Sequence, residues 1–251
     1  MSLTVDLNAD LGEGSGQDDA LLHLVTSANV ATGFHAGDAE SMRKAVETAR
    51  ANSVAIGAHP SLLDRETFGR NERETSPEEV YESVAYQIGV LQAIADHAGA
   101  RVVHVKPHGA LYNMAARRGD LAQAIVRAMT EIDPNLLLFA LPGSELERAA
   151  LNAGVRAVPE FFADRNYLAD GSLVLRSRPD ALLHDPDEAA VRVVQMLRHG
   201  RISAVDGREF EVRGETICVH GDTADAVAFV RALRMRLEAA QVRIASPVAA
   251  L

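Results

Sequence analysis

The chain has 251 residues, of which 47% are hydrophobic and 24% are charged; these proportions are ordinary for a folded globular protein and exclude a disordered chain. Acidic residues outnumber basic residues by 35 to 25, which gives a formal net charge of −10. Because this charge disfavours binding to nucleic-acid phosphates and to anionic lipid, we expect a small-molecule ligand and neither nucleic acid nor membrane as a partner.

Short runs rich in β-branched residues alternate with longer helical patterns, which is the arrangement of a parallel sheet covered by helices. No low-complexity linker divides the chain, so we predict one domain over residues 1–251. The alternation alone does not decide whether the sheet is open or closes into a barrel. The predicted strands are Thr4–Asn8, Asn29–Thr32, Val54–Ala58, Val102–Lys106, Leu136–Ala140, Arg156–Glu160 and Thr216–His220.

Capping residues mark the starts of several predicted helices. Ser76 precedes a proline at the first helical position and a glutamate at the third, and Asp185 begins a similar segment. We also expect Asp38 to cap a helix. Residues 246–251 are predicted to form a loose tail.

Ionisable and amide side chains gather where the predicted strands end. In parallel α/β folds the ligand site lies at the carboxyl ends of the strands, so we expect these side chains to share one pocket. The candidate residues are Asn8, Asp10, Glu13, His35, His59, Lys106, His108, Glu160, Arg165, His220 and Asp222.

Lys106 is the most informative of these residues. Side chains two residues apart share a face of a strand, and His104, Lys106 and His108 follow one another at that spacing. An unpaired ammonium within an apolar strand is costly, so we expect Lys106 Nζ to lie near a strand-end carboxylate. Its apolar stem suggests that a methionine replacement preserves the fold.

Each polar residue taken alone also has a structural interpretation. A histidine at a strand end is often only hydrogen-bonded, and Asp10 or Asp222 could cap the following helix. The joint pattern nevertheless favours a functional pocket.

Common catalytic motifs do not occur in the sequence. There is no Gly-x-x-x-x-Gly-Lys-Ser/Thr phosphate loop, no Gly-x-Gly-x-x-Gly after a strand and no Gly-x-Ser-x-Gly elbow. Aspartate and histidine at strand ends suit zinc or another divalent ion, but their spacing matches no closed metal signature, so the metal question stays open.

The single cysteine and the chain start favour a cytoplasmic location. Cys218 has no partner for an intrachain disulfide, as is usual in a reducing compartment. It lies between Ile217 and Val219, which predicts a packed core position and not a nucleophile. The first residues lack the basic segment and apolar run of a signal peptide.

Six segments, taken in chain order, carry a family resemblance. They are Asp6–Glu13, Gly33–Asp38, Gly57–Ser61, Val105–Asn113, Glu160–Arg165 and Val219–Asp222. Together they resemble the LamB/YcsF family. The chain departs from the family pattern at Thr32, where a cysteine is usual, and at Leu62, Leu63 and Thr67.

The resemblance implies an α/β fold, an irregular seven-stranded (β/α) barrel related to glycoside hydrolases and deacetylases. It also implies that the chain is the A subunit of an ATP-dependent 5-oxoprolinase, which cleaves 5-oxo-L-proline to L-glutamate while ATP is hydrolysed to ADP and phosphate. Subunits B and C are the implied partners, ATP is the implied cosubstrate, and a divalent metal is compatible with the site.

This reaction requires anion binding and general base catalysis. Lys106 and Arg165 suit anion binding, whereas the base could be a carboxylate (Asp10, Glu13 or Asp222) or an imidazole (His59 or His108). The candidate catalytic residues are Asp10, Glu13, His59, Lys106, His108 and Asp222. The candidate substrate-binding residues are Asn8, His35, Glu160, Arg165 and His220.

Two other functions remain open from the sequence. The fold also suits a metal-dependent carbohydrate deacetylase or amidohydrolase, for which metal content and ATP-independent hydrolysis are diagnostic. Alternatively, the chain is a binding subunit that delivers substrate to a partner that carries all the chemistry.

Overall fold

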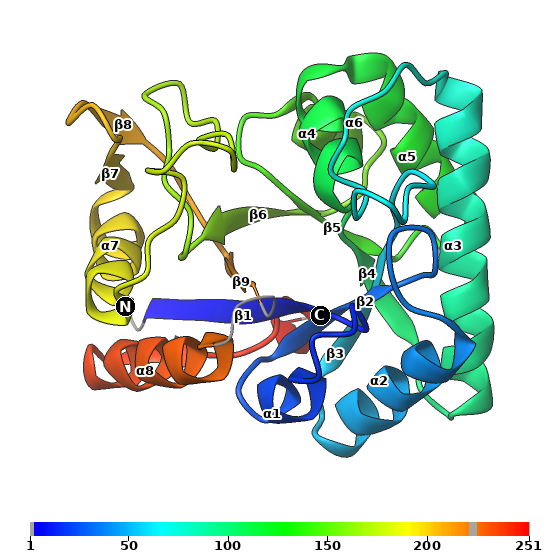
Figure 1. Ribbon diagram of the computed structural model, residues 1–251, viewed down its shortest axis with the longest axis horizontal. Coiled ribbons are helices and arrows are strands. Elements are labelled where there is room, and N and C mark those ends of the chain that lie inside the picture. The colour runs from blue at the N-terminus through cyan, green and yellow to red at the C-terminus, as the bar shows by residue number, and fades with distance from the viewer. Residues whose placement is uncertain (1–2, 221–224, 251) are drawn as a thin grey trace.

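The computed structural model describes residues 3–220 and 225–250, and its central feature is a closed barrel of parallel strands (Figure 1). The barrel strands, in order of pairing, are β1 (Leu3–Leu11), β2 (Ser27–Ala31), β3 (Ala55–His59), β4 (Val102–Val105), β5 (Leu137–Ala140), β6 (Ala157–Phe162) and β9 (Thr216–Val219). Pairing of Asp6–Ala9 in β1 with Thr216–Val219 in β9 closes the ring. The predicted seven-stranded (β/α) barrel is confirmed, and each predicted strand overlaps one barrel strand.

Three short strands lie outside the barrel. β10 (Val242–Ile244) pairs with the first three residues of β1, which is long enough to bind β10 and β9 in succession. β7 (Arg201–Ser203) and β8 (Glu209–Glu211) form an antiparallel pair after the helix α7 (Pro186–His199). Strands of three residues are too short for hydrophobic alternation to predict them.

Helices cover the outside of the barrel (Figure 1). They are α1 (Asp18–Leu22), α2 (Ala39–Ala51), α3 (Pro77–His97), α4 (Gly109–Arg117), α5 (Gly119–Ile132), α6 (Glu145–Asn152), α7 (Pro186–His199) and α8 (Ala226–Ala239). The predicted caps are confirmed: Ser76 and Asp185 accept backbone N–H groups of α3 and α7, and Asp38 forms a capping box at α2. Among the described residues, no helix combines the length and apolar character needed to cross a bilayer.

The loose tail predicted for residues 246–251 is wrong for its described part. Pro247–Ala250 forms a 3-10 helix, η1. Val248 packs against Leu137, Phe139 and Val158, and Arg156 Nη1 donates to Pro247 O at 3.3 Å. An apolar contact and a backbone acceptor therefore hold this segment against β5 and β6.

The two faces of the barrel wall differ in chemistry. Leu7, Ala9 and Leu11 belong to a continuous apolar core that is shared with the covering helices. The alternate residues on the same strand are polar and equally buried, so polar groups fill much of the interior. Each of them needs a hydrogen-bond partner, because burial removes it from water. The buried polar residues of the barrel strands are Asp6, Asn8, Asp10, Ser27, Asn29, His59, His104, Glu160 and Thr216, and Lys106 follows β4 directly.

Gly57 makes room in this interior for the ring of His104. A Cβ at position 57 would lie only 2.0 Å from His104 Nε2. The His104 ring is fully buried and stacks on Phe139 with a centroid distance of 4.2 Å, so it has no free space to retreat into. Position 57 therefore has no room for a side chain and requires glycine.

We predict that Gly57→Ala lowers the free energy of unfolding by about 1–3 kcal/mol, the usual cost of overpacking a buried site. Denaturant unfolding measures this change. The same substitution in a His104→Ala background should cost much less, because the clashing ring is gone. Equal losses in both backgrounds would show that the contact with His104 is not the cause.

Candidate active site at the barrel mouth

Lys106 lies at the centre of the polar interior, where the barrel opens at the carboxyl ends of its strands; we call this end the mouth. Its Nζ is 2.9 Å from Asp10 Oδ1 and 2.9 Å from Glu160 Oε1. It also lies 3.2 Å from Asn8 Oδ1 and 3.0 Å from Cys218 Sγ. Burial alone would lower the pKa of Lys106, but the charge of Asp10 above all raises it well above its ordinary value. The predicted position of Lys106 is confirmed.

These contacts fix the orientation of the Asn8 amide. Because an ammonium only donates, Asn8 must present its Oδ1 to Lys106. Asn8 Nδ2 then donates to Glu160 Oε1 at 3.1 Å and to Thr216 Oγ1 at 2.7 Å. Asn8 therefore bridges Lys106 and the base of the barrel.

Asn29 extends this chain of hydrogen bonds to β4. Its Nδ2 donates to Asn8 Oδ1 at 2.7 Å and to Asp10 Oδ1 at 2.8 Å. Its Oδ1 lies 2.8 Å from His104 Nε2, so this ring nitrogen must carry the proton. Burial lowers the pKa of His104 to about 3, which keeps its ring neutral.

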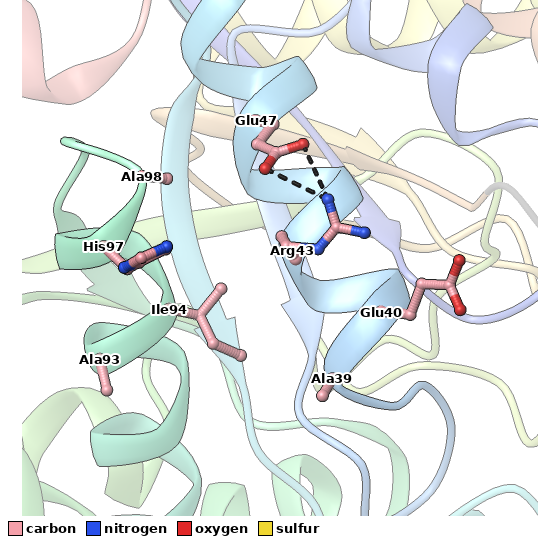
Figure 2. Close-up of a pocket in the computed structure, with 8 residues that line it drawn as sticks. All are labelled: Ala39, Glu40, Arg43, Glu47, Ala93, Ile94, His97 and Ala98. Carbon is pink, nitrogen blue, oxygen red and sulfur yellow. Dashed lines mark hydrogen bonds and ion pairs between the residues drawn. The ribbon is translucent and has the colours of Figure 1, made fainter.

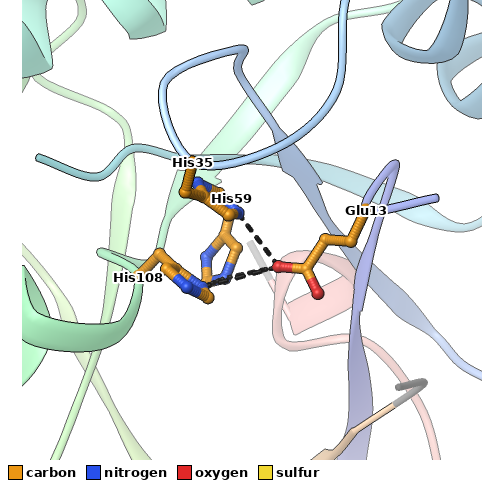
Figure 3. A group of neighbouring side chains, drawn as sticks. All are labelled: Glu13, His35, His59 and His108. Atoms are coloured by element: carbon orange, nitrogen blue, oxygen red, sulfur yellow. Dashed lines mark hydrogen bonds and ion pairs between the residues drawn. The ribbon is translucent and has the colours of Figure 1, made fainter. Parts of the chain in front are cut away.

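Four predicted residues converge beside Lys106 at the mouth (Figure 3). Glu13, His35, His59 and His108 each follow or end a different one of the strands β1 to β4. Glu13 Oε1 lies 3.0 Å from His35 Nε2 and 3.5 Å from His108 Nδ1, and His108 Nδ1 lies 2.9 Å from His59 Nε2. The rings of His35 and His108 stack with a centroid distance of 3.8 Å.

The second nitrogen of each of these imidazoles is held by the surrounding chain. His59 Nδ1 and His108 Nε2 each face a carbonyl oxygen, which only accepts, and His35 Nδ1 faces the Ser61 hydroxyl, which already donates to Leu62 O. Each of these second nitrogens therefore carries a proton. The remaining ring nitrogens face the Glu13 side of the cluster, and the four groups could hold a metal ion. The second contacts are His59 Nδ1 to Lys106 O at 2.7 Å, His108 Nε2 to Phe68 O at 2.9 Å and His35 Nδ1 to Ser61 Oγ at 3.0 Å.

Asp10 connects this cluster to Lys106. Its Oδ2 lies 3.4 Å from His59 Nε2, while its Oδ1 contacts the ammonium. Burial would raise the pKa of Asp10, but the charges of His59 and Lys106 hold it well below its ordinary value. Burial would lower the pKa of His59, but the charge of Asp10 raises it. Burial lowers the pKa of both His35 and His108.

His220 and Asp164 form a second pair on the opposite side of the mouth. Asp164 Oδ2 accepts from His220 Nδ1 at 2.7 Å and from its backbone N–H at 3.1 Å. Burial would raise the pKa of Asp164, but the charge of His220 lowers it to about 2. The carboxylate fixes a proton on His220 Nδ1, so Nε2 is the ring nitrogen that remains available to a ligand. A cavity of about 450 Å³ lies beside this pair, lined also by His184 and Phe229.

A second group of possible metal ligands, Asp10, Cys218 and His220, is less suited to a metal. Their ligand atoms lie within 4.8 Å of one another, but Lys106 Nζ contacts both the aspartate and the sulfur. Cys218 is fully buried, as predicted. Burial raises the pKa of its thiol well above the ordinary value, so the sulfur stays protonated.

The structure brings together most of the predicted site. Arg165, expected to bind an anion, is 7% exposed and donates from Nη2 to Val174 O at 2.6 Å in the loop after β6. Asp222 lies outside the described residues. The predicted residues gathered at or below the mouth are Asn8, Asp10, Glu13, His35, His59, Lys106, His108, Glu160 and His220.

Several residues of the site were not predicted as such from the sequence. Asn29 lies two residues after Ser27 on one strand face, a polar spacing that could have indicated its inward position. Asp164 lies two residues after the end of β6, and Tyr112 lies one helical turn after His108. Only the closed barrel shows that Asp164 meets His220 across the β6–β9 pair.

A groove of about 520 Å³ between α2 and α3 lies apart from this chemistry (Figure 2). Ala39, Ile94 and His97 line it, together with the exposed ion pair of Arg43 with Glu47. None of its lining residues belongs to the predicted site.

Comparison with known proteins identifies the fold and the family of the chain. A lactam utilization protein from Thermus thermophilus is 45% identical, with a TM-score of 0.90 over 97% of this chain and 99% of that chain. A proposed cellobiose-phosphate cleavage protein from Enterococcus faecalis is 16% identical, with a TM-score of 0.60 over 100% of this chain and 99% of that one. A polysaccharide deacetylase from Bacillus cereus is 12% identical, with a TM-score of 0.52 over 98% and 92% of the two chains. These last two share the barrel fold, and because the LamB/YcsF family profile matches residues 5–251, the chain belongs to the LamB/YcsF family.

Proposed function

We propose that the chain is the A subunit of an ATP-dependent 5-oxoprolinase, which cleaves 5-oxo-L-proline to L-glutamate while ATP is hydrolysed to ADP and phosphate. The observation that carries the proposal is the buried set of acids, imidazoles and one ammonium at the mouth. Similarity to a lactam utilization protein supports a cyclic amide as the substrate class. Two partner subunits, B and C, complete the proposed enzyme.

Hydrolysis of a lactam requires activation of both the carbonyl group and the attacking water. Amide resonance makes the carbonyl carbon a poor electrophile, so the oxygen must be activated, and phosphorylation by ATP achieves this. Water must then lose a proton to a base. His220 suits proton exchange, because Asp164 holds its Nδ1 proton and leaves Nε2 available, in a ring that lies beside Asp10.

Lys106 supports this chemistry electrostatically. Its ammonium faces four acceptors but has three protons, so its direct binding of a substrate carboxylate requires loss of an existing contact. Its main role in our proposal is to keep Asp10 ionised and to hold the Glu160 carboxylate in place inside the barrel. The fixed charges are then in place before a ligand arrives.

The cluster of Glu13, His35, His59 and His108 fits a divalent metal ion. One carboxylate and three imidazoles are suitable ligands, and each ring is oriented by a second hydrogen bond. A bound ion would supply Lewis-acid polarisation of a carbonyl oxygen.

We predict that the purified chain binds Co²⁺ at this cluster. Titration followed by visible absorption should show one site, and His59→Ala or His108→Ala should weaken binding by at least about tenfold. His199→Ala is the matched control, because His199 is exposed at the end of α7. Unchanged affinity in both cluster variants would contradict a metal site.

The catalytic assignment is tested by reconstitution. We expect the chain alone to release no appreciable glutamate from 5-oxo-L-proline, and the mixture with subunits B and C and ATP to do so. The reason is that the chain combines acid and base groups with no recognisable phosphate loop, so ATP requires a partner or shared site.

Glutamate release is measured for each combination of subunits, with and without ATP. ATP-dependent release by the isolated chain would contradict the division between subunits. If the complete mixture with ATP releases no glutamate, the oxoprolinase assignment is contradicted. Metal-dependent, ATP-independent hydrolysis of an N-acetylated sugar would favour the deacetylase function.

Lys106→Met should abolish turnover and, contrary to the expectation from its apolar stem, also destabilise the fold. Removing one partner of a buried ion pair costs about 3–5 kcal/mol, because the other charge stays buried; here two carboxylates, on Asp10 and Glu160, lose their cation. Adding Asp10→Asn and Glu160→Gln should restore much of the stability without activity. Denaturant unfolding and the reconstituted assay measure both effects, and an active, stable Lys106→Met variant would contradict this role.

A further inference from the structure

The cavity beside His220 is lined by both apolar and charged side chains. Its volume of about 450 Å³ lies within the usual range of small-molecule pockets. The apolar part of the described lining comes from Leu182 and Leu183, in the loop after β6, and from Phe229 on α8. A ligand bound here can therefore bury a small hydrocarbon ring.

His220 connects this cavity to the buried charges of the mouth. Its side chain lines the cavity, and Asp164 fixes the orientation of its ring through Nδ1. A ring nitrogen of His220 lies within 4.8 Å of a carboxylate oxygen of Asp10, which in turn contacts Lys106. A carbonyl group bound in the cavity beside His220 would thus lie next to the groups that we assign to the chemistry.

Arg176 brings a permanent positive charge to the cavity. Burial would raise the pKa of Asp164, but the charge of His220 lowers it, and the charge of Arg176 adds to the lowering. A guanidinium has five N–H groups in a planar fork, so it can bind a ligand carboxylate at two points and keep other neighbours. Two other cations are less suited: Arg165 donates within its own loop, and the protons of Lys106 already face protein acceptors.

The acidic residues of the lining each have another source of compensating positive charge. Asp164 is paired with His220. Asp225 is the N-cap residue of α8, where the helix dipole stabilises a negative charge. His184, which also lines the cavity, can add a hydrogen-bond donor beside Arg176. The lining therefore suits a ligand that carries a carboxylate on an apolar ring.

A cyclic amide with a carboxylate has this chemistry. We propose that the cavity binds 5-oxo-L-proline, with its carboxylate on Arg176, its ring methylene groups against Phe229 and its lactam carbonyl beside His220. This inference rests on the proposed function and adds to it a specificity residue: Arg176 selects lactams that carry a carboxylate over lactams that do not.

Binding of two lactams to the full chain tests this role. Ligand-observed NMR titration compares 5-oxo-L-proline with 2-pyrrolidinone, which is the same ring without the carboxylate. Arg176→Gln should weaken binding of 5-oxo-L-proline by about 10- to 100-fold, the usual effect of removing a charge-assisted hydrogen bond, and should leave 2-pyrrolidinone binding unchanged. Phe229→Ala should weaken binding of both lactams, because both bury the ring.

Arg178→Gln is the matched control. Arg178 lies two residues further along the same loop, is exposed and pairs with Asp180, and it does not belong to the described lining of the cavity. Its replacement should change the affinity for neither lactam. A loss of 5-oxo-L-proline affinity in Arg178→Gln as large as that in Arg176→Gln would show a general effect of surface charge and overturn the inference.

The reconstituted enzyme supplies a second measurement. With subunits B and C and ATP, Arg176→Gln should raise the KM for 5-oxo-L-proline by a similar factor and leave kcat close to that of the wild type, because the carboxylate is remote from the bond that is cleaved. The melting temperature of the variant should stay close to that of the wild type, since the Arg176 side chain is exposed.

Three results would overturn the inference while leaving the oxoprolinase proposal intact. They are unchanged affinity and KM for 5-oxo-L-proline in Arg176→Gln, equal weakening of both lactams in this variant, and a wild-type chain that binds neither lactam although the complete mixture releases glutamate. A wild-type mixture that releases no glutamate would instead overturn the proposed function.

Discussion

The buried ammonium of Lys106 is the constraint on which the interior of this barrel depends. A lysine closed off from water is tolerated only when its charge is neutralised and its protons are accepted. Asp10 and Glu160 supply the charge, and the Asn8 amide and Cys218 sulfur complete the contacts. Since Asn8 must turn its oxygen to Lys106, the orientation of Asn29 and the proton position on His104 follow in turn.

This network requires a stable scaffold around it. The interior of a (β/α) barrel is usually filled by branched apolar side chains, whereas here much of it is hydrogen-bonded polar groups. Even at the base of the barrel, burial raises the pKa of Asp6 to about 6, although Thr216 and Thr26 hydroxyls donate to it. The apolar contact between strands and covering helices must therefore provide most of the hydrophobic stabilisation.

The predictability of the fold and of the site has different physical origins. The barrel strands and the helix caps were predictable because alternation and capping are local properties of the sequence. Lys106 was predictable because a lysine within an apolar strand has few tolerable environments. The contact of Tyr112 with Glu160 was not predictable, because β4, α4 and β6 meet only through the closed barrel. Cys218 was correctly placed as buried, but the same spacing of two with Thr216 and His220 could also have shown that it faces inward.

Asp10 makes the two halves of the mouth electrostatically dependent on each other. One of its oxygens contacts Lys106, which also holds Glu160, and the other faces His59 in the imidazole cluster. A cation at the imidazole cluster and the ammonium of Lys106 would therefore share the same carboxylate. Each would reduce the negative charge available to the other, so the affinity of the cluster for a metal depends on Lys106 as well as on the ligands. The second carboxylate, Glu160, offsets this competition, because it supplies Lys106 with a second negative charge while the other oxygen of Asp10 faces His59.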